Sequence, residues 1–120
     1  MAELLDYLKQ AVKDHASDLF IVAGGPVCEK LDNHMTPVSG DRVFPQETER
    51  LITDLYQLAG RDISGYLQRG DDDFSLSMPE LARFRVNAYR QRGSMAAVVR
   101  VVAFDIPDHK ALGIPEQIMG

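Results

Sequence analysis

Residues 83–89 constrain the fold more than any other part of the chain, because apolar and polar side chains alternate there without interruption. With the period of two that a β-strand imposes, the apolar positions face one side of a sheet and the polar positions face the other. The apolar positions are Phe84, Val86 and Ala88, and the polar positions are Arg83, Arg85, Asn87 and Tyr89. Such a strand packs one face against a core and presents guanidinium groups on the opposite face.

Two interpretations of these arginines fit the pattern. Arginine suits phosphate binding, because its planar guanidinium group donates two parallel hydrogen bonds and keeps its charge. Alternatively, the strand is solvated and its arginines pair with nearby carboxylates, such as those of Asp71, Asp72 and Asp73. The pattern alone leaves both interpretations open.

The arginine-rich run stands out because the rest of the chain is acidic. Residues 82–100 hold five of the 13 lysines and arginines and no acidic residue, whereas the whole chain has a formal net charge of -5. This overall charge argues against nucleic-acid binding by the whole surface but leaves room for a local basic patch. A length of 120 residues fits one domain with a real core. The single cysteine, Cys28, excludes an internal disulfide.

One helix is predicted before a first group of strands in the sequence, and two more are predicted after it. Apolar residues at helical spacing predict helices over residues 2–15, 45–60 and 61–69. Pro45 suits the first turn of the second helix and Gly60 suits its end, although Phe44 is not a favoured N-cap. In the third helix we expect Ile63, Tyr66 and Leu67 to point inward.

Strands are predicted in two groups of three. The first group is a strand over residues 18–23 and a hairpin over residues 27–38, whose turn contains Asn33, a residue that tolerates positive φ. The second group is a meander over residues 73–78, 82–91 and 95–103. Helices segregated from an antiparallel sheet of about six strands define the α+β class, with two to three helices.

Five short motifs carry a resemblance to one family. In chain order they are Ala16-Ser17-Asp18-Leu19, Asp72-Asp73-Phe74-Ser75, Arg83-Phe84-Arg85-Val86-Asn87, Gln91-Arg92-Gly93-Ser94 and Leu112-Gly113-Ile114-Pro115. With these motifs the chain resembles the N-terminal domain of the PilT-like type IV pilus retraction ATPases, which belong to the wider type II and type IV secretion ATPases. The resemblance covers essentially all 120 residues.

The resemblance implies a domain organisation. Residues 1–104 would form a PAS-like N-terminal domain, and residues 105–120 would connect it to a RecA-like ATPase core. The core carries the phosphate loop in such enzymes, and no GxxxxGK[ST] sequence occurs in these 120 residues. We therefore expect the chain to be a domain cut from a longer protein. The parent would use ATP and Mg²⁺, whereas the 120 residues alone should bind no cofactor and hydrolyse no ATP.

The resemblance also implies functional residues and partners. The family forms hexameric rings in which the N-terminal domain packs on the ATPase core of the next subunit. Arg85 and Arg100, with Arg83 as a further candidate, match arginines that approach the nucleotide phosphates in trans. Arg90 and Arg92 are expected at the surface or at a subunit interface. The parent would be a cytoplasmic motor for pilus retraction and twitching motility, peripheral to the inner membrane and bound to an inner-membrane pilus or secretion platform, with no nucleic-acid partner.

Two other hypotheses for the function also fit the sequence. Arg83, Arg85, Tyr89 and Arg90 interleave basic and aromatic groups, as in sheets that bind single-stranded nucleic acid. A PAS-like sensory or adaptor module with a small ligand in its core is a second rival. The three histidines lack the spacing of metal ligands, so no metal site is expected.

Overall fold

The computed structural model describes residues 2–78 and 81–104, and every statement below concerns these residues. They form one six-stranded antiparallel sheet with the strand order β3-β2-β1-β6-β5-β4. The strands are β1 (Asp18–Ile21), β2 (Cys28–Leu31), β3 (His34–Pro37), β4 (Asp72–Met78), β5 (Ala82–Gln91) and β6 (Ser94–Phe104). The expected α+β class with about six strands is confirmed, whereas the expected connector over residues 105–120 lies outside the described residues.

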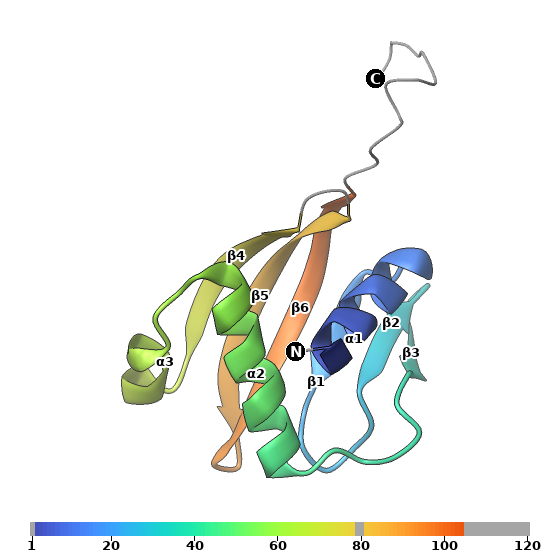
Figure 1. Cartoon of the computed structure of the whole chain (residues 1–120). Helices are drawn as coiled ribbons and strands as arrows, with labels where there is room; N and C mark the ends of the chain where they lie inside the picture. Colours follow the sequence, from blue (N-terminus) through green and yellow to red (C-terminus); the bar gives the residue numbers. More distant parts are fainter. Residues whose placement is uncertain (1, 79–80, 105–120) are drawn as a thin grey trace.

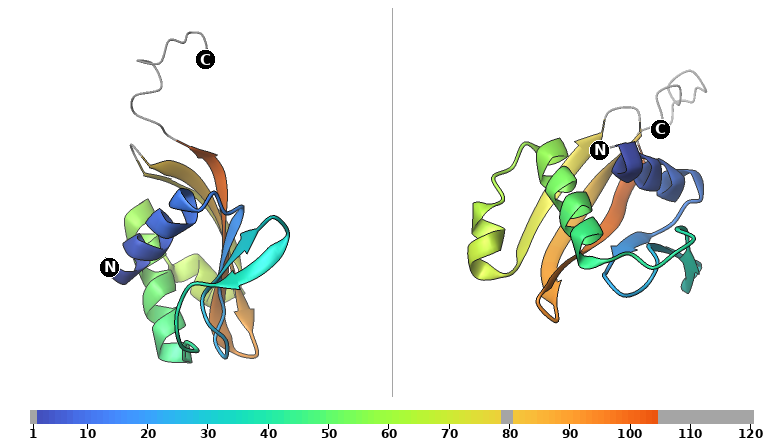
Figure 2. Two further views of the ribbon diagram at one scale, coloured as in Figure 1. Left: turned by 90° about the vertical axis from the view of Figure 1, so that its right-hand side faces the viewer. Right: turned by 60° about the horizontal axis from the view of Figure 1, so that its bottom comes forward.

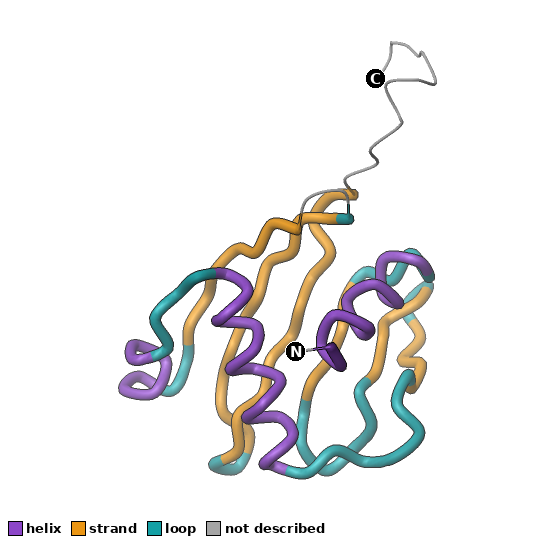
Figure 3. Tube along the Cα trace, in the orientation of Figure 1, coloured by secondary structure: helices purple, strands orange, loops and turns teal. Residues whose placement is uncertain are grey.

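Three helices accompany the sheet: α1 (Ala2–Lys13), α2 (Pro45–Ala59) and α3 (Ser64–Arg69). The two long helices, α1 and α2, lie on the same face of the sheet (Figure 1), and the side view leaves the opposite face without a helix (Figure 2). The loop over residues 38–44 runs from β3 along one end of the sheet to the start of α2 (Figure 3). The sheet therefore has a covered face and an open face.

The core fills the space between the covered face and the helices. Its members are fully or almost fully buried aliphatic and aromatic side chains, mostly from α1, α2, α3, β1, β4, β5 and β6. They include Leu4, Leu8, Leu19, Ile21, Leu51, Ile52, Leu55, Tyr56, Tyr66, Phe84, Val86 and Val99. The alternation in β5 is confirmed, because Phe84, Val86 and Ala88 are buried here while Arg83, Arg85 and Asn87 are exposed.

Two hairpin turns hold residues other than glycine at positive φ. The turn between β2 and β3 has Asp32 at φ 49° and Asn33 at φ 69°, and the turn between β5 and β6 has Arg92 at φ 54° and Gly93 at φ 83°. Positive φ at both central residues is the requirement of a type I′ hairpin turn, whose twist matches that of the flanking strands. Both predicted hairpins are therefore present, with His34 in β3 rather than in the turn.

The ends of α2 follow the predicted signals, whereas one expectation for α3 is wrong. Phe44 precedes α2, and Oε1 of Glu47 accepts a hydrogen bond from the Phe44 amide at 2.9 Å, which supplies the carboxylate half of a capping box. Gly60 ends α2 at φ 65°. In α3 the expectation for Leu67 is wrong, since this residue is 49% exposed while Tyr66 fills the core. A helix of six residues has room for one buried position where it meets the sheet.

Candidate functional site

The central feature of the open face is a pair of arginines on neighbouring strands. Arg85 of β5 and Arg100 of β6 are directly opposite each other in the antiparallel register. Directly opposed side chains have Cβ atoms about 5 Å apart, and like charges in this position repel. Both side chains are largely exposed, at 62% and 70%. The sheet therefore presents two positive charges to solvent at a site where they need a negative partner.

Two carboxylates flank the arginine pair. Asp73 of β4 accepts hydrogen bonds from Arg85, with Nε to Oδ1 at 3.2 Å and Nη2 to Oδ2 at 2.9 Å. Asp18 of β1 accepts a hydrogen bond from Nε of Arg100 at 3.3 Å. Across four strands the charges run negative, positive, positive, negative. We call these four residues, Asp18, Arg100, Arg85 and Asp73, the charge row.

The charge row lines a cavity on the open face. The cavity has a volume of about 340 Å³ and is completed by Asn87 and Val98. The hydrogen bonds from Arg85 hold the pKa of the Asp73 carboxyl below its usual value, so this aspartate is ionised at neutral pH. An anion in the cavity would meet two guanidinium groups and one amide side chain. The row thus offers an anion two guanidinium groups, one of which Asp73 already occupies through two hydrogen bonds.

The other predicted arginines occupy different positions. Arg83 is exposed on the open face, two residues from Arg85 and opposite Ser77 of β4. Arg90 lies on the covered side, where its guanidinium group is 5.9 Å from the centre of the Tyr66 ring and Nη2 donates to the Leu67 carbonyl at 3.2 Å. Arg92 is exposed at the tip of the turn. The structure therefore brings together Arg83, Arg85 and Arg100 and separates them from Arg90.

This arrangement weakens the single-strand nucleic-acid reading. That reading grouped Arg90 with Arg83, Arg85 and Tyr89 on one surface, but Arg90 packs against α3 instead. The two carboxylates of the charge row interrupt the basic surface. A strand of phosphates would therefore meet alternating charge rather than a continuous positive path.

Asp18 is the member of the charge row whose partner the sequence did not reveal. It lies at the start of β1, as expected for a strand over residues 18–23, with a side chain only 8% exposed. Ser17 Oγ donates to Asp18 Oδ2 at 2.9 Å, which leaves Oδ1 for Arg100. The partnership joins residues 82 positions apart, so no local signal could have predicted it. The pairing of Asp73 with an arginine was anticipated.

The neighbouring Asp72 belongs to a separate cluster on the covered side. Arg61 donates to both of its oxygens at 2.9 Å, Tyr56 donates its hydroxyl at 2.8 Å, and Arg69 donates at 3.2 Å. Although burial opposes ionisation, the hydrogen bonds from Arg61 hold the pKa of Asp72 well below its usual value. This cluster anchors α2, α3 and β4 to one another and leaves no acceptor free for a ligand.

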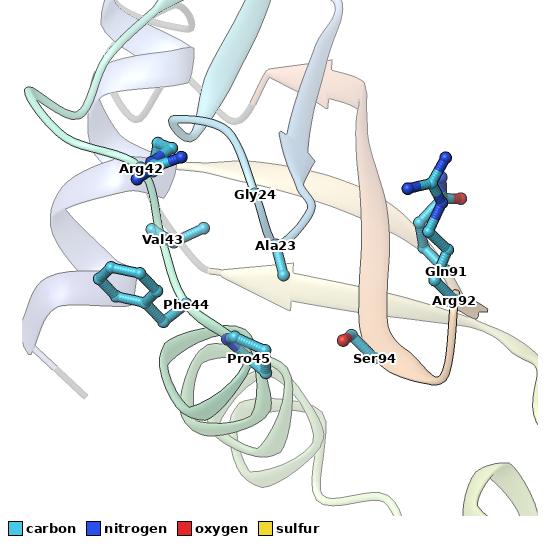
Figure 4. Close-up of a pocket in the computed structure, with 9 residues that line it drawn as sticks. All are labelled: Ala23, Gly24, Arg42, Val43, Phe44, Pro45, Gln91, Arg92 and Ser94. Carbon is cyan, nitrogen blue, oxygen red and sulfur yellow. The ribbon is translucent and has the colours of Figure 1, made fainter.

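A larger cavity at one end of the sheet does not gather its polar groups. It measures about 400 Å³ and lies beside the start of α2 and the turn between β5 and β6. Its two arginines, Arg42 and Arg92, lie far apart on either side of the cavity in Figure 4. A ligand site needs a few convergent polar groups, so the charge row remains the better candidate.

Residues 2–78 and 81–104 contain neither a cluster of metal-ligating side chains nor a membrane-spanning helix. No three His, Cys, Asp or Glu side chains lie close enough to hold a metal ion. None of the described helices is long and apolar enough to cross a membrane.

Comparisons with known proteins identify relatives of this chain. No family model matches the chain. The type IV pilus ATPase PilU of Pseudomonas aeruginosa is 31% identical over 110 residues, covering 91% of this chain and 28% of PilU. The type IV pilus retractation ATPase PilT of the same organism is 30% identical over 115 residues, covering 95% of this chain and 33% of PilT. The chain therefore spans about a third or less of these relatives.

A solved structure shares the fold. The crystal structure of the pilus retraction motor PilT with bound ADP superposes with a TM-score of 0.72 at 31% identity, covering 93% of this chain and 32% of that chain. The helix-covered antiparallel sheet is thus a PAS-like α+β domain of the kind that accompanies a motor ATPase. In sequence and in fold, the chain belongs to the PilT-like ATPases as their N-terminal domain.

Proposed function

We propose that this domain supplies Arg85 and Arg100, with Arg83 beside them, to nucleotide bound by the ATPase core of a neighbouring subunit in a hexameric ring. The observation that carries the proposal is the direct opposition of Arg85 and Arg100 on an open sheet face. Each guanidinium group has a carboxylate partner, yet the two groups stay exposed and directly opposed, a position in which like charges repel. A phosphate chain between them would remove that repulsion.

The mechanism follows from the charge of a transferring phosphoryl group. During transfer, negative charge spreads over the peripheral oxygens, and an arginine from a neighbouring element stabilises that charge. Arg100 and Arg85 would play this part in trans. If ATP engages both arginines and ADP fewer, each round of hydrolysis changes the attraction between the domain and the neighbouring core. The two would then rotate against each other, which is a way to turn hydrolysis into motion.

The same proposal extends to the parent protein. Residues 105–120 would connect the domain to a RecA-like core that binds ATP and Mg²⁺, and the 120 residues alone would bind no cofactor. The relatives PilU and PilT support a pilus ATPase. We assign the parent to pilus retraction and twitching motility, in the cytoplasm at the inner membrane, with the inner-membrane pilus or secretion platform as a partner. Arg90 and Arg92 would lie near subunit contacts.

The test is ATP turnover by the full-length parent carrying Arg100→Ala, measured together with the size of the ring. We expect turnover to fall by on the order of 10³ with the hexamer intact, since this is the range of an arginine supplied in trans. Arg42→Ala is the matched control, because Arg42 is an exposed arginine at the other cavity. Normal turnover by an intact Arg100→Ala ring would refute the role of the arginine pair in hydrolysis.

A further inference from the structure

We propose that the two carboxylates of the charge row act in opposite senses on anion binding: Asp18 positions Arg100 for an incoming phosphate, whereas Asp73 competes with that phosphate for Arg85. This inference deepens the function proposed above and rests on it, since it concerns the regulation of the same site. It adds two residues to the site and assigns each a separate role.

Asp73 is placed to compete. It binds Arg85 through both of its oxygens and so occupies the guanidinium edge that a phosphate would use. Both side chains are exposed, at 62% for Arg85 and 47% for Asp73. Exposed ion pairs contribute little free energy, because water screens them and both side chains lose rotamer freedom. A polyphosphate carries several charges and can displace such a carboxylate.

Asp18 is placed to position its partner. Its side chain is 8% exposed, and its Oδ2 atom accepts a hydrogen bond from the Ser17 hydroxyl at 2.9 Å. It accepts a hydrogen bond from Arg100 at Nε only, and the two terminal Nη groups of Arg100 have no partner among the described residues. A carboxylate that holds Nε orients the guanidinium plane and leaves its Nη groups free. Asp18 can therefore remain bound to Arg100 while Arg100 binds an anion.

The geometry of the cavity fits this division of roles. Asp73 and Asp18 lie at the two ends of the charge row, with the arginines between them, and the cavity of about 340 Å³ is lined by all four. When a phosphate enters, the bond between Arg85 and Asp73 breaks and the bond between Arg100 and Asp18 remains. The row thus discriminates among anions by charge density, because only a ligand that outcompetes Asp73 gains both arginines.

The experiment measures binding of inorganic tripolyphosphate to the 120-residue chain at fixed ionic strength, followed by nuclear magnetic resonance of backbone amides and arginine Nε groups. The variants are Asp73→Asn and Asp18→Asn. Asp71→Asn is the matched control, because it removes the same charge from an exposed residue next to the site. Relative to this control, we expect Asp73→Asn to tighten binding about three- to fivefold and Asp18→Asn to weaken it by a similar factor.

A measurement on the unchanged chain keeps the test decisive if Asp18→Asn fails to fold. On addition of tripolyphosphate, the Nε signal of Arg85 should shift strongly because its bond to Asp73 breaks, whereas the Nε signal of Arg100 should move little. Equal shifts of both signals would overturn the inference, as would tighter binding in both aspartate variants. So would the absence of binding at the charge row in the unchanged chain and in Asp73→Asn.

These outcomes are separable from a failure of the proposed function. If Arg100→Ala abolishes ATP turnover in the parent while both aspartate variants bind tripolyphosphate equally, the arginine role stands and the division of roles between the carboxylates falls. If the aspartates act with opposite sign while turnover survives Arg100→Ala, the row is an anion site that does not serve hydrolysis.

Discussion

Asp72 and Asp73 are neighbours in sequence and lie on opposite faces of the same sheet. Asp72 faces the helices, is 5% exposed in its side chain and accepts hydrogen bonds from Tyr56, Arg61 and Arg69. Asp73 faces the open side, is 47% exposed and pairs with Arg85. The first carboxylate joins three elements of the fold, and the second is one end of the proposed anion site. Successive side chains of a strand point to opposite faces, so the adjacent residues Asp72 and Asp73 serve different purposes: Asp72 stabilises the fold, and Asp73 belongs to the proposed binding site.

This comparison teaches that partners, rather than residue type, decide what a carboxylate does. Burial alone raises the pKa of an acid, but hydrogen bonds from Arg61 and Tyr56 hold the pKa of Asp72 low. Glu29 of β2 shows the opposite case, since it is fully buried on the covered face and neither carboxylate oxygen has a hydrogen-bond partner among the described residues. Burial, with the nearby Asp14 carboxyl, raises its pKa to about 7.

The strongest test of the comparison is to remove each aspartate. Asp72→Ala leaves the Tyr56 hydroxyl and the Arg61 guanidinium without their acceptor, and we expect the free energy of unfolding to fall by about 3 kcal/mol. Asp73→Ala removes an exposed pair and should cost less than about 1 kcal/mol. Urea denaturation of both variants measures the difference. Equal losses would show that the open face contributes to stability as much as the covered face does.

The second test uses Glu29, whose raised pKa makes the stability of the fold depend on pH. Its pKa lies at about 7 in the folded chain and at the ordinary value of 4.5 when unfolded. The folded state therefore holds the proton of Glu29 more tightly, so the contribution of this group to stability is full below pH 4.5 and is lost as pH rises through 7. A difference of this size corresponds to at most ~3 kcal/mol.

The variant Glu29→Gln removes this titration. We expect it to lose less stability than the unchanged chain between pH 4.5 and pH 8, and to be the more stable of the two at pH 8. Thermal or urea unfolding at both pH values measures this, with the exposed Glu49→Gln as control. A pH profile of Glu29→Gln that matches that of the unchanged chain would contradict the assignment.

The smallest expected effect on stability comes from comparing a hydrogen bond to a charged acceptor with a hydrogen bond to a neutral one. Tyr56 donates its hydroxyl to the Asp72 carboxylate and Tyr66 donates its hydroxyl to the Tyr89 carbonyl, each at 2.8 Å. We expect Tyr56→Phe to cost about 1.5–2 kcal/mol and Tyr66→Phe about 1 kcal/mol, because hydrogen bonds to charged groups are stronger. Urea unfolding of the pair measures the difference, and a greater cost for Tyr66→Phe would reverse the ranking.

Much of the fold could be predicted because its signals are local. The alternation around Phe84, the turn signal at Asn33 and the stop at Gly60 each act within a few residues, and each is present as expected. Leu67 was predicted wrongly because a short helix has no second turn to fix which face is buried. The arginines of the site could be found from the same alternation.

The arrangement of the site depended on information that is not local. Arg90 continues the basic run, yet the pleat turns it toward Tyr66 and away from the charge row. The role of Asp18 depends on the pairing of β1 with β6, which joins distant parts of the chain. Strand order is set by tertiary packing, so the composition of the charge row became visible only in three dimensions.

The position of β6 also has a consequence for how the chain folds. This last strand is inserted between β1 and β5, so it alone joins the hairpin half of the sheet to the meander half. The meander can form early from contacts close in sequence, whereas the pairing of Asp18 with Arg100 closes a loop of more than 80 residues. During synthesis, the edge of β1 that pairs with β6 stays unpaired until β6 has left the ribosome. We therefore expect assembly of the charge row to be a late folding event, completed only when the sheet itself closes.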